Sequence, residues 1–288
     1  MTGRPRGTAL GPFTIGALGS VVAAGLLKGR PPGGLERWTR KNHAGRPVTL
    51  FEGPAYAVAA VAGALAGGAG APAAVAGLGG AAFGALDDLA GDSSNKGLSG
   101  HLSAALHGEV TTGVIKIAGL GATGLLRAAM IDRSRKRHGV MATVVGGAVI
   151  AGSANIANLL DLRPGRALKV VLLLAAPIAA SGRGTDLGIA TATAGAVAGA
   201  AIGALPDDLT GRSMLGDTGA NSAGALLGTA LVARTGPRAR LLALAVVTAL
   251  TLASEKVSFT EVIESTPGLR QLDALGRPGW SSLTALAK

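Results

Sequence analysis

The chain has 288 residues, of which 48% are hydrophobic, 15% are charged and 2% are aromatic, with a formal net charge of +11 and a mean hydropathy of +0.45. Soluble domains carry about 25% charged residues, so this composition excludes an ordinary soluble domain and indicates a membrane protein. The absence of cysteine excludes disulfides, thiolate metal sites and a cysteine nucleophile. The basic residues are scattered through short loops without interleaved aromatic residues, which favours anionic lipid headgroups over nucleic acid as their partner.

The first apolar run, Ala9 to Leu27, follows a short basic tail. No clean cleavage site leads from it into a soluble domain, so it is interpreted as a transmembrane helix and not as a signal peptide. Residues 28–53 form a polar loop with six basic residues, which favours the cytoplasmic side. The uncharged run from Pro54 to Leu86 is too long for one ordinary span, and Gly67 to Pro72 interrupts it, so two short helices are expected there.

Six further apolar runs follow, at roughly 111–130, 140–158, 168–182, 187–205, 219–233 and 240–254. The glycine-rich and alanine-rich composition suits helices that pack closely in lipid. The predicted fold is therefore all-α, a polytopic integral membrane helix bundle with about nine transmembrane helices. Residues 1–288 form a single transmembrane domain, in which 255–288 is an interfacial tail on the cytoplasmic side.

The acidic residues provide a test of this topology. If 28–53 is cytoplasmic, alternation of the spans places 14 of the 16 Asp and Glu residues on that same side. The Lys/Arg distribution supports the orientation only loosely, because a basic cluster at 133–137 falls on the other side. The prediction is a multi-pass protein of the cell membrane with an acidic site facing the cytoplasm.

Carboxylates recur where the apolar runs end, at Asp87-Asp88, Asp161 and Asp217, and we expect them to converge. Like charges around one point repel each other unless a cation lies among them. Oxygen-rich sites of this kind suit Mg²⁺ or Mn²⁺, which also bind phosphate oxygens, so the cluster predicts metal-assisted phosphoryl transfer. A solvated loop that only links two helices is the alternative for any single acidic segment.

Four other polar residues are candidate substrate contacts. Asn155 and Asn158 lie one turn apart before Asp161 and suit a sugar or phosphate, although either one alone is better explained as a polar helix end packed against a neighbour. Lys96 and Lys116 suit phosphate groups. Lys116 lies about one turn inside an apolar run, so snorkelling to the lipid headgroups is its alternative. The four histidines show no metal-ligand spacing.

Four motifs then occur in an order that resembles a known family. They are GRPVTLFEG before a helix, LDDL at the end of an apolar run, NxxNLLD, and MLGDTGANSAGALLG. The order is similar to that of the polyprenyl-phosphate hexose-1-phosphate transferases, which include the phospho-muramoyl-pentapeptide transferase and the enzymes that load N-acetylglucosamine-1-phosphate onto undecaprenyl phosphate. The resemblance covers roughly residues 9–270.

The resemblance implies a Mg²⁺-dependent membrane enzyme that transfers a sugar-1-phosphate from a UDP-sugar to a polyprenyl phosphate in cell-envelope glycan synthesis. It implies that Asp217 and Asp88 bind the metal, and that Asp87 and Asp88 position or deprotonate the lipid phosphate. Asn158 and Asp161 would belong to the nucleotide-side loop, and Lys96 corresponds loosely to a basic residue that follows the acidic pair. A homodimer is left open.

The chain also departs from the family pattern. Pro164 stands where the family has a second Asp, Arg163 and Arg166 lie beside it, and the histidine-rich loop and final helix are missing. These departures predict an altered donor or loss of activity. The alternative function is a non-catalytic membrane protein of the same fold that binds polyprenyl phosphate or an envelope-assembly partner. A transporter is disfavoured, because the carboxylates lie at the ends of the spans and not at mid-membrane.

Overall fold

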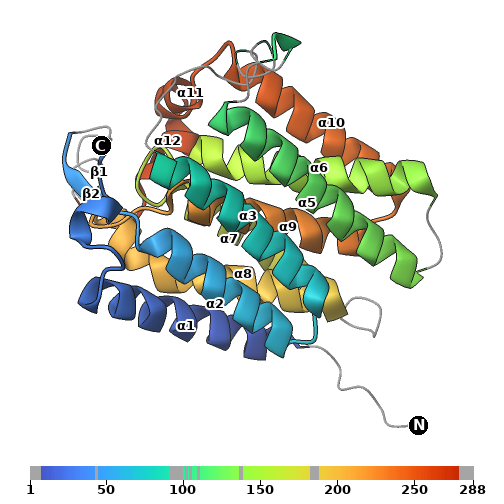
Figure 1. Cartoon of the computed structure of the whole chain (residues 1–288), viewed down its shortest axis with the longest axis horizontal. Coiled ribbons are helices and arrows are strands. Elements are labelled where there is room, and N and C mark those ends of the chain that lie inside the picture. The colour runs from blue at the N-terminus through green and yellow to red at the C-terminus, as the bar shows by residue number, and fades with distance from the viewer. Residues whose placement is uncertain are drawn as a thin grey trace.

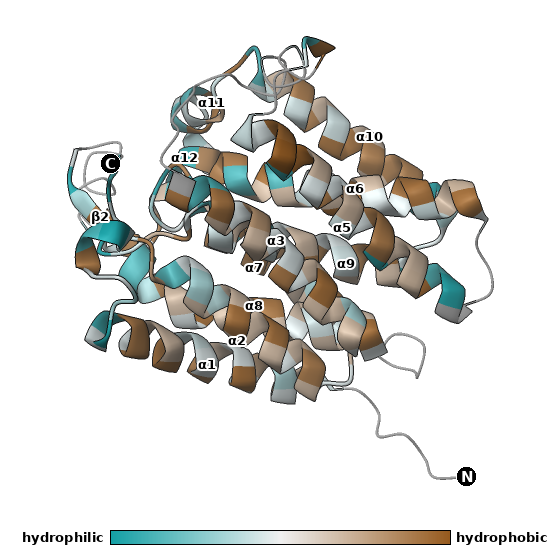
Figure 2. Cartoon of the chain, in the orientation of Figure 1, coloured by the Kyte–Doolittle hydropathy of each residue, from teal (hydrophilic) through white to brown (hydrophobic). Residues whose placement is uncertain are grey.

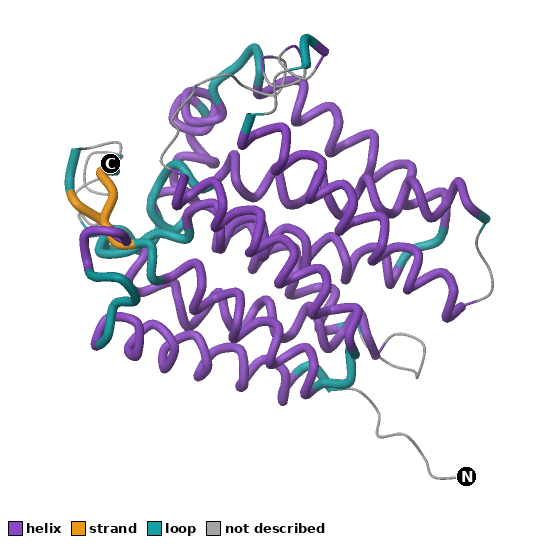
Figure 3. The backbone as a smooth tube through the Cα atoms, in the orientation of Figure 1, coloured by secondary structure: helices purple, strands orange, loops and turns teal. Residues whose placement is uncertain are grey.

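The computed structural model describes residues 8–42, 45–90, 100, 103, 106–108, 111–135, 139–181 and 188–278. Within these residues, nine helices coincide with the nine helices predicted from the eight apolar runs (Figures 1 and 3). They are α1 (Leu10–Gly29), α2 (Glu52–Ala66), α3 (Ala71–Ala90), α5 (Thr112–Arg135), α6 (Val140–Leu160), α7 (Arg166–Ala180), α8 (Gly188–Leu209), α9 (Gly216–Arg234) and α10 (Pro237–Ser254). The predicted break inside 54–86 is confirmed, because Gly68 and Gly70 adopt positive φ angles of 82° and 71° between α2 and α3.

Within the described residues, five helices are long and apolar enough to cross a membrane: α1, Thr112–Arg133 of α5, α6, α8 and α10. They indicate a multi-pass membrane protein. α2 and α7 have 15 residues each, which gives helices of about 22 Å, shorter than the ~30 Å hydrocarbon core. Apolar residues predominate along the helices of the bundle, whereas hydrophilic residues concentrate near α11, α12 and β2 (Figure 2).

The centre of the bundle is formed by α8 and α9, whose buried residues are mostly Ala, Gly and Thr. α8 packs against α1, α2 and α7, while α9 packs against α3 and α6. Such small side chains let helix backbones approach closely, as the composition predicts. The core is therefore built from close backbone contacts and few large side chains.

The polar elements gather at one end of the bundle, which we call the polar end (Figures 2 and 3). It contains a 3₁₀ turn (Leu35–Trp38) and the antiparallel strands β1 (Thr39–Lys41) and β2 (Pro47–Thr49), in which Thr39 pairs with Thr49. It also contains two short helices, α11 (Phe259–Ser265) and α12 (Pro267–Ala274). The strand pair was not predicted, because 28–53 was interpreted as a polar loop without regular structure.

Contacts between distant segments confirm that the predicted acidic segments share this end. Lys28 pairs with Asp207, the Thr49 carbonyl accepts a hydrogen bond from Ser213 Oγ at 2.9 Å, and Arg166 pairs with Asp273. The other end, here the far end, contains the C-terminus of α9 and the N-terminus of α10. That the polar end faces the cytoplasm stays a prediction.

Candidate functional site

Asp88, at the C-terminal end of α3, binds the N-terminus of α9. Its carboxylate accepts hydrogen bonds from the amides of Asp217 and Thr218 at 3.0 and 2.8 Å, and from Thr218 Oγ1 at 2.6 Å. The first amides of a helix have no partner inside the helix, and the helix dipole favours negative charge at this point. Asp88 therefore caps α9 from a neighbouring helix and holds Asp217 in place.

Lys116 of α5 lies between the two other carboxylates of the cluster. Its Nζ is 3.0 Å from Asp87 Oδ2 and also pairs with Asp217 Oδ2. The Lys116 side chain is 13% exposed, against 26% for Asp87 and 25% for Asp217. Lys116 therefore turns toward the acids, and its ammonium group supplies the cation that two neighbouring carboxylates require.

Two cavities meet at this cluster. A cavity of about 340 Å³ between α5, α6 and α10 is lined by Asp87 and Lys116 at the polar end and by apolar residues such as Ile117, Leu120 and Leu159. A second cavity, of about 520 Å³, is lined by polar groups that include Arg40, Lys41, Asn158 and Asp161. Asp87 lines both cavities, and Asp217 lines the second.

The predicted substrate contacts are divided between the two cavities. Asn155 lines the apolar cavity and donates to Thr251 Oγ1 at 3.4 Å, whereas Asn158 and Asp161 line the polar cavity. Lys96 lies outside the described residues. The sequence analysis did not single out Arg40, which also lines the polar cavity and donates to the Asp88 carbonyl oxygen.

A second group of acids lies deeper at the polar end. Asp161, Asp208 and Glu52 are 8%, 2% and 3% exposed. Asp208 accepts a hydrogen bond from the Gly165 amide at 3.1 Å, whereas both Glu52 carboxyl oxygens lack a partner among the described residues. Burial raises the pKa of the Asp161 carboxyl well above its usual range, and the charge of Asp208 raises it further.

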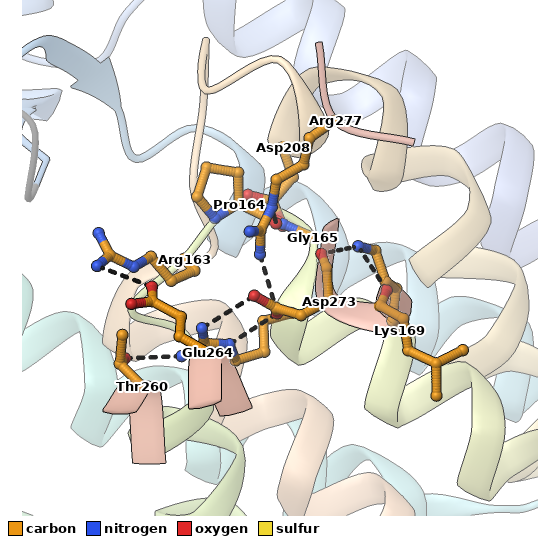
Figure 4. Close-up of polar contacts among 11 residues, drawn as sticks. Arg163, Pro164, Gly165, Lys169, Asp208, Thr260, Glu264, Asp273 and Arg277 are labelled. Carbon is orange, nitrogen blue, oxygen red and sulfur yellow. Dashed lines mark hydrogen bonds and ion pairs between the residues drawn. The ribbon is translucent and has the colours of Figure 1, made fainter. Parts of the chain in front are cut away.

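The segment after α10 is bound to the loop between α6 and α7 (Figure 4). Arg166 donates to both Asp273 oxygens at 2.8 and 3.0 Å and to Thr260 Oγ1 at 2.9 Å. Arg277 pairs with Asp273 at 2.9 Å and donates to the Pro164 carbonyl oxygen at 2.7 Å. Burial alone would raise the pKa of Asp273, but Arg166 and Arg277 outweigh it and lower the pKa below its usual range.

The donor groups permit a partial fit for a divalent cation. Among the described residues, no three Asp, Glu or His side chains are placed to hold a metal by themselves. Mg²⁺ is commonly bound through one or two carboxylates together with substrate phosphates and water, and Asp87 and Asp217 provide two such carboxylates. Both Asp88 oxygens accept hydrogen bonds from α9, and the role of Asp88 as a metal ligand, which the family resemblance implies, stays a prediction.

Comparison with known proteins leaves the family assignment as an expectation. No protein-family model matches the chain. No curated protein matches it at a significant level.

Proposed function

We propose that the polar end is the active site of a membrane-embedded sugar-1-phosphate transferase, whose donor is a nucleotide-sugar such as a UDP-sugar and whose acceptor is a polyprenyl phosphate. The observation that carries this proposal is the position of Asp87 between an apolar and a polar cavity. A lipid phosphate with its chain in the apolar cavity and a nucleotide-sugar in the polar cavity would meet at Asp87, Lys116 and Asp217. All nine apolar helices would then cross the membrane, with the polar end in the cytoplasm.

The reaction joins the two phosphates. An oxygen of the polyprenyl phosphate attacks the phosphorus that carries the sugar, a new P–O–P bond forms, and the bond to the nucleoside monophosphate breaks. The products are a lipid-diphosphate-sugar and a nucleoside monophosphate. Negative charge gathers on the phosphoryl oxygens during this step, so catalysis depends on positioning and on nearby positive charge.

The residues of the chain divide these tasks. Lys116 would release Asp217 and bind the lipid phosphate itself. Asp87 would accept a proton from that phosphate if it arrives protonated. A Mg²⁺ or Mn²⁺ ion bound by Asp217 and Asp87 would supply positive charge to the diphosphate of the donor. Asp88 would act by holding the N-terminus of α9, and Asn158 and Arg40 would contact the donor.

Turnover of purified protein tests this function. The full chain is mixed with Mg²⁺, undecaprenyl phosphate and a panel of nucleotide-sugars, and release of nucleoside monophosphate is followed. Release from one donor is expected, and Asp217→Asn should abolish it. Asp207→Asn is the matched control, because Asp207 lies at the same end but pairs with the half-exposed Lys28 and the exposed Arg212. Equal release by both variants would refute the role of Asp217.

One observation favours the non-catalytic alternative. Lys116 already pairs with both Asp87 and Asp217, which gives a protein that only binds a lipid phosphate a structural reason to keep both acids. The same assay separates the two functions. If the chain binds undecaprenyl phosphate but releases no nucleoside monophosphate from any donor, it is the non-catalytic binding protein.

A further inference from the structure

An apolar groove that the proposed reaction does not use runs along the bundle, from Leu160 and Ala167 near the polar end to Thr235 and Ala239 at the far end. The groove has a volume of about 580 Å³ and lies between α7 and α10, with α6 and α9 as its floor. Its lining is almost entirely apolar, with residues such as Leu174, Leu227, Leu231, Leu242 and Val246. α7 and α10 both pack on the floor helices but make little contact with each other, so the groove separates them.

Two arginines continue the apolar stripes of this groove at the far end. On α9, residues 224, 227, 228 and 231 line the groove, and Arg234 follows three residues after Leu231. On α10, residues 239, 242, 243 and 246 line it, and Arg238 precedes Leu242 by four residues. Neither arginine lines the groove itself, but Arg234 precedes Thr235 and Arg238 precedes Ala239, which line its far end, so both arginines stand beside this mouth.

Neither arginine has an acidic partner among the described residues. Nη1 of Arg234 is buried without a hydrogen bond, and Arg238 is exposed. Asp132 is a described acid at this end, and both of its oxygens pair with Arg240 at 2.8 Å. An anion bound beside this mouth would give the buried Arg234 nitrogen an acceptor and would offset the charge of both arginines.

The dimensions of the groove fit one lipid leaflet. From Ala239 to Leu250, α10 lines it over about 17 Å, close to half of the ~30 Å hydrocarbon core. The mouth lies about 25 Å along α9 from Asp217. A polyprenyl phosphate bound at Asp217 would therefore leave Arg234 and Arg238 without an anion, whereas a bilayer phospholipid could place its phosphate beside them.

We propose that the groove is a binding site for an anionic phospholipid of the bilayer, with an acyl chain along α9 and α10 and the phosphate at Arg234 and Arg238. Two arginines at the surface of an apolar slot select a lipid by the charge of its headgroup. The site would bind phosphatidylglycerol in preference to a zwitterionic lipid of the same chain length. It is independent of the catalytic proposal.

Lipid quenching tests the site. Val246→Trp, in a full chain with Trp38→Phe and Trp280→Phe, reports on the groove. Val22→Trp in the same background reports on the exposed face of α1, where Val22 is 58% exposed. Brominated phosphatidylglycerol should quench the groove reporter at about tenfold lower concentration than brominated phosphatidylcholine, whereas the α1 reporter should not discriminate.

The arginines are tested by removing their charge. R234Q together with R238Q should abolish the preference, while R133Q, an exposed arginine at the end of α5, should retain it. Equal quenching by both lipids, or a preference that survives the double substitution, overturns the proposal. If neither lipid quenches the groove reporter and the protein is a dimer, the groove is occupied by a second copy of the chain, and the proposal is wrong. Displacement of brominated phosphatidylglycerol by equimolar polyprenyl phosphate assigns it to the substrate tail.

Discussion

Asp88 offers the sharpest test of how the site is assembled, because within the described part of the chain its carboxylate pairs with the first turn of α9 and with no charged side chain. Asp88→Ala removes three hydrogen bonds to the first turn of α9. Loss of an ordinary helix cap costs about 0.5–2 kcal/mol, and a hydrogen bond to a charged group contributes about 1.5–3 kcal/mol. The three bonds share one carboxylate and are not additive, so we expect a loss of about 2–4 kcal/mol.

This loss is measurable as thermal stability in detergent. For a chain of this size, 1 kcal/mol corresponds to roughly 2 °C, so the melting temperature of Asp88→Ala should fall by about 4–8 °C. Heating followed by size-exclusion chromatography measures the folded fraction. Asp88→Asn retains one acceptor oxygen and should lose about half as much.

Asp207→Ala is the matched control for the Asp88 variants. It removes an acid from the same end, but the pairs of Asp207 with Lys28 and Arg212 are solvent-exposed and are expected to contribute about 0–1 kcal/mol. If Asp88→Ala melts at the same temperature as Asp207→Ala, Asp88 does not hold α9. Its contact with α9 would then contribute nothing measurable to the free energy of unfolding.

Four further predictions concern the same end. Lys116→Met leaves Asp87 and Asp217 without their cation and should cost about 3 kcal/mol in the melting assay at neutral pH; an unchanged melting temperature would contradict the pairing. Asp161→Asn should stabilise the protein. Burial raises the pKa of Asp161 in the folded protein, so the wild type loses stability as pH rises above the unfolded pKa near ~3.9, where only the unfolded chain ionises freely. The melting temperature of the variant should therefore exceed that of the wild type by more as pH rises from this value. A higher melting temperature only at lower pH would refute this. The pKa of Asp273 is lowered in the folded protein, so its contribution to stability is present above the unfolded pKa and is lost as pH falls through the folded pKa. Limited proteolysis within 255–277 should therefore accelerate at that acidic pH in the wild type. In Asp273→Asn it should be fast at any pH. Gly84→Ala places a methyl group against the Asp217 carbonyl and should lower the melting temperature, whereas Gly121→Ala, where a methyl group meets open space on α5, should be neutral or slightly stabilising.

The helices were predictable because apolar runs report burial in lipid whatever their tertiary partners are. Each run between Ala9 and Ser254 matches a helix in the described residues, with boundaries shifted by a few residues. Part of the convergence of Asp87 and Asp217 was predictable for a related reason, since alternation of the spans places the end of α3 and the start of α9 at the same end of the bundle. Neither prediction needed knowledge of a specific contact.

The roles of individual charges were not predictable in this way. The capping role of Asp88 was not predicted, because a cap supplied by another helix has no local sequence signal. Arg166 and Asp273 are 107 residues apart, and Asp132 and Arg240 are 108 residues apart, so no spacing links either pair. The snorkelling alternative for Lys116 is not what the structure shows, because its direction depends on the carboxylates of α3 and α9.

The glycines of α3 connect the composition of the chain to the geometry of the site. A methyl group on Gly80 would lie 2.8 Å from the Asn221 carbonyl oxygen, and one on Gly84 would overlap the backbone of Asp217. α3 and α9 therefore lie backbone to backbone, and Asp88 follows Gly84 by one helical turn on the same face. An aspartate has a short side chain, so it reaches the first amides of α9 only because the two helices are this close. The small residues that suit packing in lipid thus also set the distance over which Asp88 holds Asp217.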